Sequence, residues 1–232
     1  MSGPDTPAAP EARELHGRAY AERFDRMHGR RRLVQLLPLM RLGPTDDLVD
    51  FACGNGLLAA EVHGRVRSYT GVDFSPPFIE LAVARGARLG ASNLRFECAS
   101  IEDFCAAHPG RYDVACAFDF SEHVPDDGWR TILAAIQRSL RPGGRLYLHT
   151  PNAGFVLERM KRRNFILRQS PEHVAVRDMP ENLQLLTEAG FSIAASRFVP
   201  HYNVLRFLHP LQRLPAIGPW LRARIFIEAH AR

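Results

Sequence analysis

Short apolar runs alternate along most of the chain with longer segments whose apolar residues recur every three to four positions. The short runs are rich in β-branched and aromatic residues and predict strands, and the helical spacing predicts helices between them. The predicted strands are 47–51, 68–73, 94–98, 112–118 and 145–149, and the predicted helices are 56–63, 76–90, 101–107 and 127–140. Because strands and helices alternate, the pattern predicts an α/β fold with a doubly wound, mostly parallel sheet and helices on both faces.

The amino-terminal part of the chain departs from this alternation. Residues 1–10 are rich in proline, alanine and small polar residues, which predicts a disordered tail. Residues 11–45 show helical spacing that stops at Gly43-Pro44, so we expect two N-terminal helices that cap the site.

The carboxyl-terminal part departs from it as well. Helices are predicted at 153–164 and 180–189, and strands at 191–199 and 224–231. The segment 201–222 between those strands is too long and too apolar for a tight hairpin, so we expect helical cover there. We therefore expect one domain over 46–232, with substrate-side insertions near 152–180 and 201–222.

The octet VDFACGNG at residues 49–56 is the most informative segment for function. Gly54 and Gly56 lack Cβ atoms, so the chain can turn sharply after a buried strand and pass close to a ligand. The next segment, LLAAEVHG, carries helix formers. A strand, a glycine turn and a helix in this order predict a nucleotide-binding crevice.

A second strand ends in Asp73, about twenty residues after the glycine turn begins. A carboxylate at that place can accept hydrogen bonds from both hydroxyls of a ribose. The glycines do not follow the G-x-G-x-x-G spacing of dinucleotide enzymes, because Leu57, Leu58 and Ala59 follow Gly56. The spacing therefore disfavours NAD.

The octet resembles motif I of class I S-adenosylmethionine-dependent methyltransferases, which it matches at Asp50, Cys53, Gly54, Asn55 and Gly56. Ala52 stands where that family usually has its first glycine. Further segments, FECASIEDF, YDVACAFDFSEHVPD and SLRPGGRLYLHTPN, resemble the later motifs in the expected order. The resemblance covers about residues 30–195 and is to the small-molecule, UbiG-like type. It implies a Rossmann-like seven-stranded sheet with an antiparallel last strand pair and a helical insertion between the last two strands.

The resemblance also implies S-adenosyl-L-methionine as the cofactor and S-adenosyl-L-homocysteine as its product. Asp73 would hold the ribose, Phe74 would lie against the adenine, and Ser100 with Ile101 would frame the adenine edge. Glu102 would either assist Ser100 or face solvent at a helix start. The implied cofactor residues are Asp50, Ala52, Cys53, Gly54, Asn55, Gly56, Asp73, Phe74, Ser100, Ile101, Glu102, Asp119, Phe120 and Arg31. Tyr20 is expected to act with Arg31 at the cofactor carboxylate or to close the site.

Three histidines are candidates for a catalytic role. Methyl transfer from a sulfonium is an in-line displacement, so alignment of the two reactants supplies much of the rate. A base is needed only when the acceptor must lose a proton, as a hydroxyl must. His123, which follows a strand expected to end over the cofactor, leads His173 and His149 as the candidate base. A structural hydrogen-bonding role competes with catalysis for each of the three. The histidines favour O-methylation over N-methylation of a small-molecule or lipid-linked acceptor.

Composition narrows the class of protein. A chain of 232 residues with 46% hydrophobic and 24% charged residues is typical of one globular domain. No apolar run of 18 residues and no apolar signal region occur, so we expect a cytoplasmic enzyme without a transmembrane segment. The four cysteines contain no CxxC pair and the ten histidines no zinc-type cluster, so we expect reduced thiols and no metal.

The net charge of +5 is concentrated in segments such as ERMKRRNFILR. Such a segment is either a solvated helix face or a site for an anionic partner. A nucleic-acid methyltransferase would use it for phosphates, but FDFSEH replaces the Asn-Pro-Pro-Tyr motif of enzymes that methylate flipped bases, which disfavours nucleic acid.

Two further hypotheses are compatible with the sequence. RMKRRNFILR and NVLRFLHPLQRLPAIGPWLRAR mix arginine with apolar residues, as peripheral membrane segments do, but a lid folded onto the domain with its arginines facing outward is favoured. A non-catalytic S-adenosylmethionine-binding module would keep the same glycine turn and Asp73. A methyl-acceptor assay separates that module from an enzyme.

Overall fold

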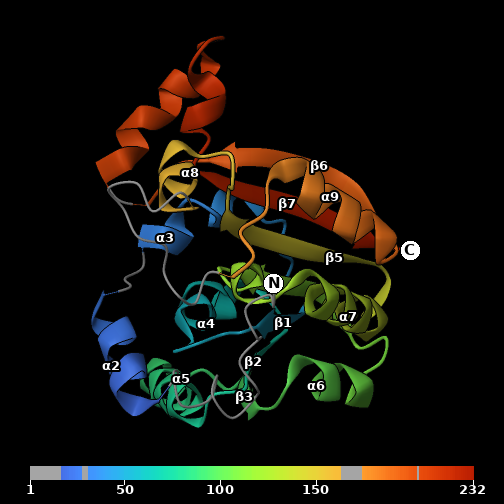
Figure 1. Cartoon of the computed structure of the whole chain (residues 1–232). Coiled ribbons are helices and arrows are strands. Elements are labelled where there is room, and N and C mark those ends of the chain that lie inside the picture. The colour runs from blue at the N-terminus through green and yellow to red at the C-terminus, as the bar shows by residue number, and fades with distance from the viewer. Residues whose placement is uncertain (1–16, 28–30, 163–173, 203) are drawn as a thin grey trace, which may run out of the picture.

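A seven-stranded sheet forms the centre of the protein in the computed structural model, which describes residues 17–27, 31–162, 174–202 and 204–232 (Figure 1). The strands are β1 (Asp47–Phe51), β2 (Ser68–Asp73), β3 (Leu94–Cys98), β4 (Tyr112–Phe118), β5 (Leu140–Pro151), β6 (Phe191–Val199) and β7 (Arg224–Ala231). Their order across the sheet is β3-β2-β1-β4-β5-β7-β6. The first five strands pair in parallel, whereas β7 is antiparallel to both β5 and β6. This sheet confirms the predicted doubly wound fold with its antiparallel last pair.

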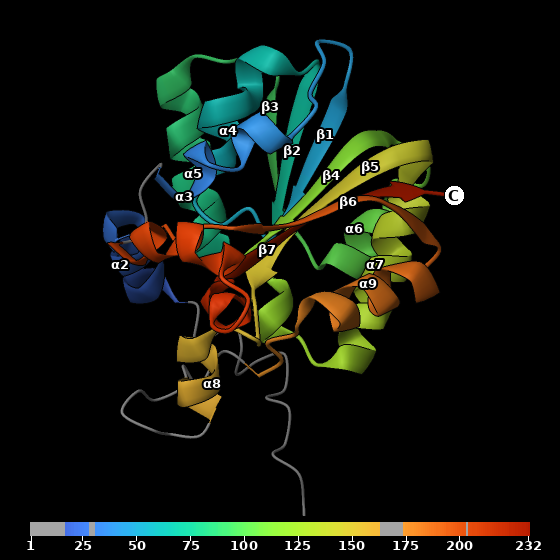
Figure 2. The ribbon, with the colours of Figure 1, turned by 90° about the horizontal axis from the view of Figure 1, so that it is seen from above.

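Helices cover both faces of the sheet (Figure 2). They are α2 (Arg18–Met27), α3 (Arg31–Val34), α4 (Leu57–Val62), α5 (Pro76–Leu89), α6 (Ile101–Ala107), α7 (Asp126–Ser139), α8 (Val156–Arg162) and α9 (Met179–Glu188). Short 3₁₀ helices are η1 (Leu37–Leu39), η2 (His63–Arg65), η3 (Ser121–His123), η4 (Val204–Arg213) and η5 (Gly218–Leu221). No helix of the described residues is long and apolar enough to cross a bilayer.

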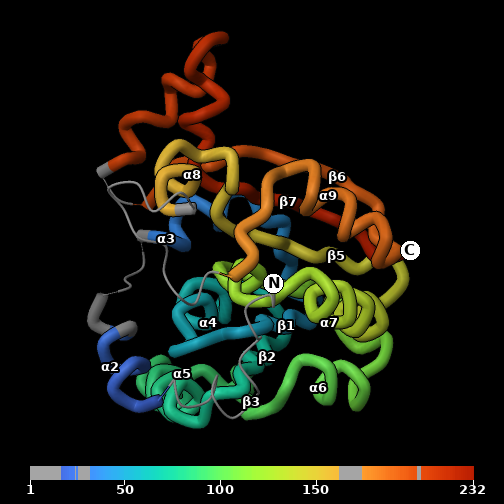
Figure 3. The backbone as a smooth tube through the Cα atoms, in the orientation of Figure 1, coloured from blue at the N-terminus to red at the C-terminus, as the bar shows by residue number. Residues whose placement is uncertain are grey.

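Alternation along the strands divides the core into two layers. Val49 and Phe51 of β1 point to the layer under α6, α7 and α9, where Trp129 and Leu133 are fully buried. Leu48, one residue out of phase, points to the layer under α3 and α4. The tube in Figure 3 shows the strands running between these two groups of helices. Because successive side chains of a strand face opposite ways, a strand buried on both faces is apolar, as β4 is from Val114 to Phe118.

Two predicted boundaries differ from the structure. The strand predicted at 145–149 begins earlier, at Leu140, because Leu140 already pairs with Tyr112 and the pairing resumes after a register shift at Arg145. Gly143, at φ 76°, allows this bulge. The second N-terminal helix is a single turn, α3, followed by η1, where Pro38 stands at the helix start.

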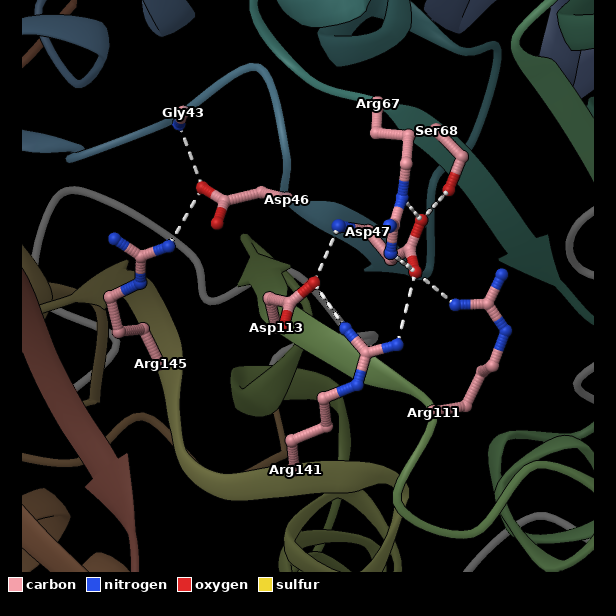
Figure 4. A network of polar contacts seen from close by, with 9 residues as sticks. All are labelled: Gly43, Asp46, Asp47, Arg67, Ser68, Arg111, Asp113, Arg141 and Arg145. Atoms are coloured by element: carbon pink, nitrogen blue, oxygen red, sulfur yellow. Dashed lines mark hydrogen bonds and ion pairs between the residues drawn. The ribbon is translucent and has the colours of Figure 1, made fainter.

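A network of arginines and carboxylates ties the amino ends of the strands together (Figure 4). The Asp47 carboxylate, only 1% exposed, pairs with Arg67, Arg111 and Arg141. Its main-chain N–H donates to Asp113, which also pairs with Arg141. A buried anion with three guanidinium partners should contribute more to stability than an exposed ion pair does.

We expect Asp47→Asn to lower the free energy of unfolding at pH 7 by about 2 kcal/mol, because it leaves three guanidinium groups without their shared anion. Burial raises the pKa of Asp47, but hydrogen bonds from Arg67, Ser68 and Arg111 lower it more, so the pKa lies below its usual range. The contribution is therefore present above the unfolded-state pKa of about 3.9 and is lost as the pH falls below it.

Urea unfolding at pH 7 and pH 3 measures this effect. The matched control is Glu188→Gln, which breaks an exposed pair with Arg130 and should change stability by less than about 0.5 kcal/mol. Equal losses in the two variants at pH 7 would show that the network adds no more than a surface pair.

Candidate active site

A cavity of about 290 Å³ opens at the carboxyl ends of β1, β2 and β4. Parallel sheets of this kind bind ligands at that edge. The residues that line the cavity are Tyr20, Arg32, Leu33, Asp50, Ala52, Cys53, Gly54, Asn55, Leu57, Leu58, Asp73, Phe74, Phe78, Phe118, Asp119, Phe120, His123 and Val124. The structure thus brings together most of the residues that the sequence predicted for the cofactor, along with His123.

The glycine loop needs a left-handed backbone at three positions. Gly54 and Gly56 have φ values of 54° and 72°, and Ala52 has a φ of 54°. A Cβ on Gly56 would lie 3.1 Å from the Cβ of Ala82 in α5, so only glycine allows this close packing. The same conformation costs roughly 1 kcal/mol at Ala52. Residues 52–55 of the loop line the cavity, and Gly56 packs the loop against α5.

Asp73 fixes the loop to the end of β2. One carboxylate oxygen accepts a hydrogen bond from the Gly54 N–H and the other from the Ser75 N–H, each at 2.9 Å. Asp73 is 7% exposed and lies in the cavity wall. Its predicted contact with a ribose would thus come from a carboxylate that is already held in place.

Asp50 lies at the buried end of the cavity. Its carboxylate accepts a hydrogen bond of 2.6 Å from the Tyr69 hydroxyl. Burial raises the pKa of Asp50 to about 7, against the opposing effects of the Tyr69 hydrogen bond and Arg32. Asp50 thus helps to hold β1 against β2 beneath the glycine loop.

Asp119 is the centre of a buried charge cluster. It has a φ of 54° and its carboxylate pairs with Arg224, with Nδ1 of His149 at 2.9 Å and with Nε of Arg32 at 3.5 Å. Burial opposes the charge on Asp119, but Arg224, His149 and Arg32 together hold its pKa well below the usual range. The cluster therefore places a permanent carboxylate in the cavity wall.

His149 belongs to this cluster and is fully buried. Its Nε2 accepts from Nε of Arg224 at 3.1 Å, and its Nδ1 faces Asp119. This network assigns the proton of the neutral ring to Nδ1, and burial lowers the pKa of His149. With both ring nitrogens engaged, His149 is placed to position Asp119 rather than to reach an acceptor.

The His123 loop is held by a buried arginine. Arg177 donates to the main-chain oxygens of Ser121 at 2.8 Å and Val124 at 2.6 Å, and to Asp126 at 2.8 Å. Phe120 packs edge-on against Trp129, with ring centroids 5.6 Å apart. His123 therefore faces the cavity from a fixed turn.

Several predicted residues lie elsewhere. Ser100 caps α6, because its Oγ accepts from the Asp103 N–H at 3.1 Å, and neither it nor Ile101 or Glu102 lines the cavity. Their role at the adenine stays a prediction. His173 and the side chain of Arg31 lie outside the described residues.

Four side chains in or around the candidate site were not predicted from the sequence: Arg32, Glu122, Arg177 and Arg224. Arg32 lines the cavity beside the predicted Arg31. Glu122 is buried, accepts from Thr150 at 3.1 Å, and burial raises its pKa. Arg177 and Arg224 stand in segments without a motif, so nothing in the sequence singled them out.

Helix α2 is fastened across the glycine loop. Asp25 of α2 accepts from the side-chain amide of Asn55 at 2.5 Å and from Arg85 of α5 at 2.6 Å, and Arg85 also donates to the main-chain oxygen of Asn55. Tyr20 of α2 lines the cavity. These contacts hold α2 beside the glycine loop, and the role of the N-terminal helices as a cap of the site stays a prediction.

The sheet order, the glycine loop and the acid at the end of β2 define a class of protein, the class I S-adenosylmethionine-dependent methyltransferases. The methyltransferase domain family matches residues 20–196, more than half of the chain. The chain belongs to that family.

Curated relatives match over a shorter stretch. The ubiquinone biosynthesis O-methyltransferase of Thiobacillus denitrificans is 35% identical over 105 residues, which cover 45% of this chain and 44% of that protein. The protein of the same name from Xanthomonas euvesicatoria is 31% identical over 105 residues, 45% of this chain and 43% of that protein. The chain thus matches less than half the length of these relatives.

Solved structures share the fold. Geranyl diphosphate C-methyltransferase from Streptomyces coelicolor, solved with S-adenosyl-L-homocysteine, superposes with a TM-score of 0.64 at 16% identity over 97% of this chain and 88% of that one. The [4+2]-cyclase SpnF superposes with a TM-score of 0.65 at 20% identity over 86% of this chain and 80% of that one. A cyclase and a methyltransferase on one fold show that the fold does not fix the reaction.

Proposed function

We propose that this chain transfers a methyl group from S-adenosylmethionine to a hydroxyl oxygen of a small-molecule or lipid-linked acceptor. The observation that carries the proposal is that His123 faces the same cavity as the glycine loop and Asp73. The names of the curated relatives, which are O-methyltransferases, support oxygen as the receiving atom.

The described residues fit an adenosyl cofactor. Gly54, in a left-handed conformation, lines the cavity without a side chain, and Asp73 offers carboxylate oxygens for a ribose. Phe74 and Phe78 line the cavity and supply apolar surface for an adenine. When bound, S-adenosylmethionine supplies a methyl group already activated by a sulfonium.

The chain then has to place an acceptor and remove its proton. Asp119 is a poor base because its partners hold its pKa low, so it acts as a fixed negative charge beside the cavity. His123 is the group placed to accept the hydroxyl proton. The fixed turn beneath His123 limits its motion, which favours the alignment that a displacement needs.

We expect His123→Gln to lower the rate of methyl transfer to an ordinary phenol about a hundredfold, because general-base catalysis contributes about that much. The affinity for S-adenosyl-L-homocysteine should change little. The rate is measured with radiolabelled S-adenosylmethionine on phenols with and without a prenyl tail.

A nitro-substituted phenol, already ionised at neutral pH, is the matched control, because it needs no base and should lose little rate in the variant. An aniline series serves the same purpose for nitrogen acceptors. An equal loss on both phenols would remove His123 as the base. Tight cofactor binding without turnover of any acceptor would favour the binding module over an enzyme.

A further inference from the structure

The segment between β6 and β7 projects from the body of the protein (Figure 1, red). It comprises η4, a turn at 214–217 and η5, and we call residues 204–221 the arm. Gly218 donates its N–H to the Leu214 oxygen at 2.8 Å, and a Cβ on Gly218 would lie 2.2 Å from the Gln212 oxygen. The backbone around Gly218 therefore packs closely against the end of η4.

Large apolar side chains of the arm face solvent. Phe207, Leu211, Leu214, Ile217 and Trp220 are each between 41% and 67% exposed. These five lie within fourteen residues of sequence, whereas the other exposed large apolar side chains of the described residues are spread over a much longer stretch of the chain. The sequence allowed a lid folded onto the domain, but in the structure these side chains are not covered. A concentrated apolar surface of this kind marks a binding surface.

The charge of the arm indicates which kind of partner surface it can bind. The arm contains no acidic residue and carries two arginines, Arg206 and Arg213. The Arg206 guanidinium lies 4.9 Å from the centre of the Phe207 ring, and that of Arg159 in α8 lies 5.1 Å from the Trp220 ring. Arginine beside half-exposed aromatic residues suits an interface in which rings enter the acyl boundary and cations meet phosphate.

From these observations we infer that the arm docks the protein on a membrane that contains anionic phospholipids. Aromatic and leucine side chains would enter the headgroup region, and Arg206 and Arg213 would contact lipid phosphates. A second copy of this chain would bring arginines against arginines, which disfavours it as the occupant.

Docking there would place the active site next to the bilayer. Arg224, which pairs with Asp119 in the cavity wall, begins β7 three residues after the arm ends. A lipid-linked acceptor would thus reach the cavity from the membrane, and this consequence rests on the proposed function. The docking itself does not depend on methyl transfer.

The test is flotation of the full chain with vesicles of phosphatidylcholine alone or with about one third phosphatidylglycerol. Binding is expected only with the anionic vesicles, together with a blue shift of tryptophan emission. The chain has two tryptophans, and Trp129 is fully buried, so the shift reports on Trp220. Brominated lipids should quench the same emission.

Three double variants locate the contact. Phe207→Ser with Trp220→Ser should weaken vesicle binding at least tenfold, and Arg206→Gln with Arg213→Gln should weaken it by about fivefold for each arginine. The matched control, Val83→Ser with Leu89→Ser, changes exposed apolar residues of α5 and should bind as the parent does. Retained binding of S-adenosyl-L-homocysteine shows that each variant is folded.

Several outcomes would overturn the inference. These are equal binding to both vesicle types, no binding at all, and equal losses in the α5 control. A dimer that light scattering detects and that the Phe207–Trp220 variant abolishes would instead make the arm a contact between copies. Failure of every methyl-acceptor assay would leave vesicle binding unchanged, so the two proposals fail separately.

Discussion

Replacing Arg224 with methionine should lower the free energy of unfolding by about 3–5 kcal/mol. The guanidinium is buried, pairs with Asp119 and donates to His149, so its loss leaves a buried carboxylate without its main partner. Methionine keeps much of the volume, which limits the cost of a cavity. Methyl transfer should fall as well, because Asp119 lines the cavity and loses its position.

Two controls separate charge from packing in that experiment. Asp119→Asn in the Arg224→Met background should recover part of the stability, because it removes the uncompensated charge. Arg130→Met, at an exposed pair with Glu188, should cost less than about 1 kcal/mol. If the double variant is no more stable than Arg224→Met alone, the carboxylate is not the source of the loss.

The stability that the Arg224–Asp119 pair provides should depend on pH in a defined direction. The pKa of Asp119 is lowered in the folded protein, so the pair stabilises above the unfolded-state pKa of about 3.9. That contribution falls as the pH drops toward the folded-state pKa. Urea midpoints at pH 7 and pH 3 should therefore differ more for the parent than for the double variant.

Asp73→Ala should weaken binding of S-adenosyl-L-homocysteine by about five- to 150-fold, the effect of losing about 1–3 kcal/mol at a charged hydrogen-bonding partner. The variant loses the predicted ribose contact and also the two carboxylate bonds that hold the N–H groups of Gly54 and Ser75. Isothermal titration at pH 7 measures the change. Asp73→Asn keeps one carbonyl oxygen and should lie between the parent and the alanine variant.

The control for Asp73 is Asp127→Ala, which removes an exposed carboxylate in the first turn of α7. It should leave the affinity unchanged. Thermal melting in the absence of ligand checks that the Asp73 variants are folded. An affinity that matches the parent in Asp73→Ala would mean that the cofactor binds without this carboxylate.

The sequence by itself determined the fold and most of the predicted cofactor residues that line the cavity. Alternating strands and helices, the glycine octet and Asp73 all lie within about 30 residues of each other or repeat along the chain, so local spacing reveals them. The predicted parallel sheet and the clustering of Asp50, Gly54 and Asp73 follow from such local signals, whereas the closing antiparallel pair was implied by the resemblance to the methyltransferase family.

Only the tertiary structure revealed the contacts of Arg224 and Arg177 in the candidate site and the exposed apolar surface of the arm. Arg224 meets Asp119 across 105 positions, and Arg177 meets Ser121 across 56, and neither arginine stands in a motif. The order of β4, β5 and β7 in the sheet brings Arg224 to Asp119, and sequence spacing does not contain that order. Likewise, the sequence of the arm is compatible with a buried lid or an exposed surface. Whether the apolar side chains of the arm are buried depends on which other parts of the chain pack against the arm. In the structure Phe207 and Trp220 stay exposed to solvent.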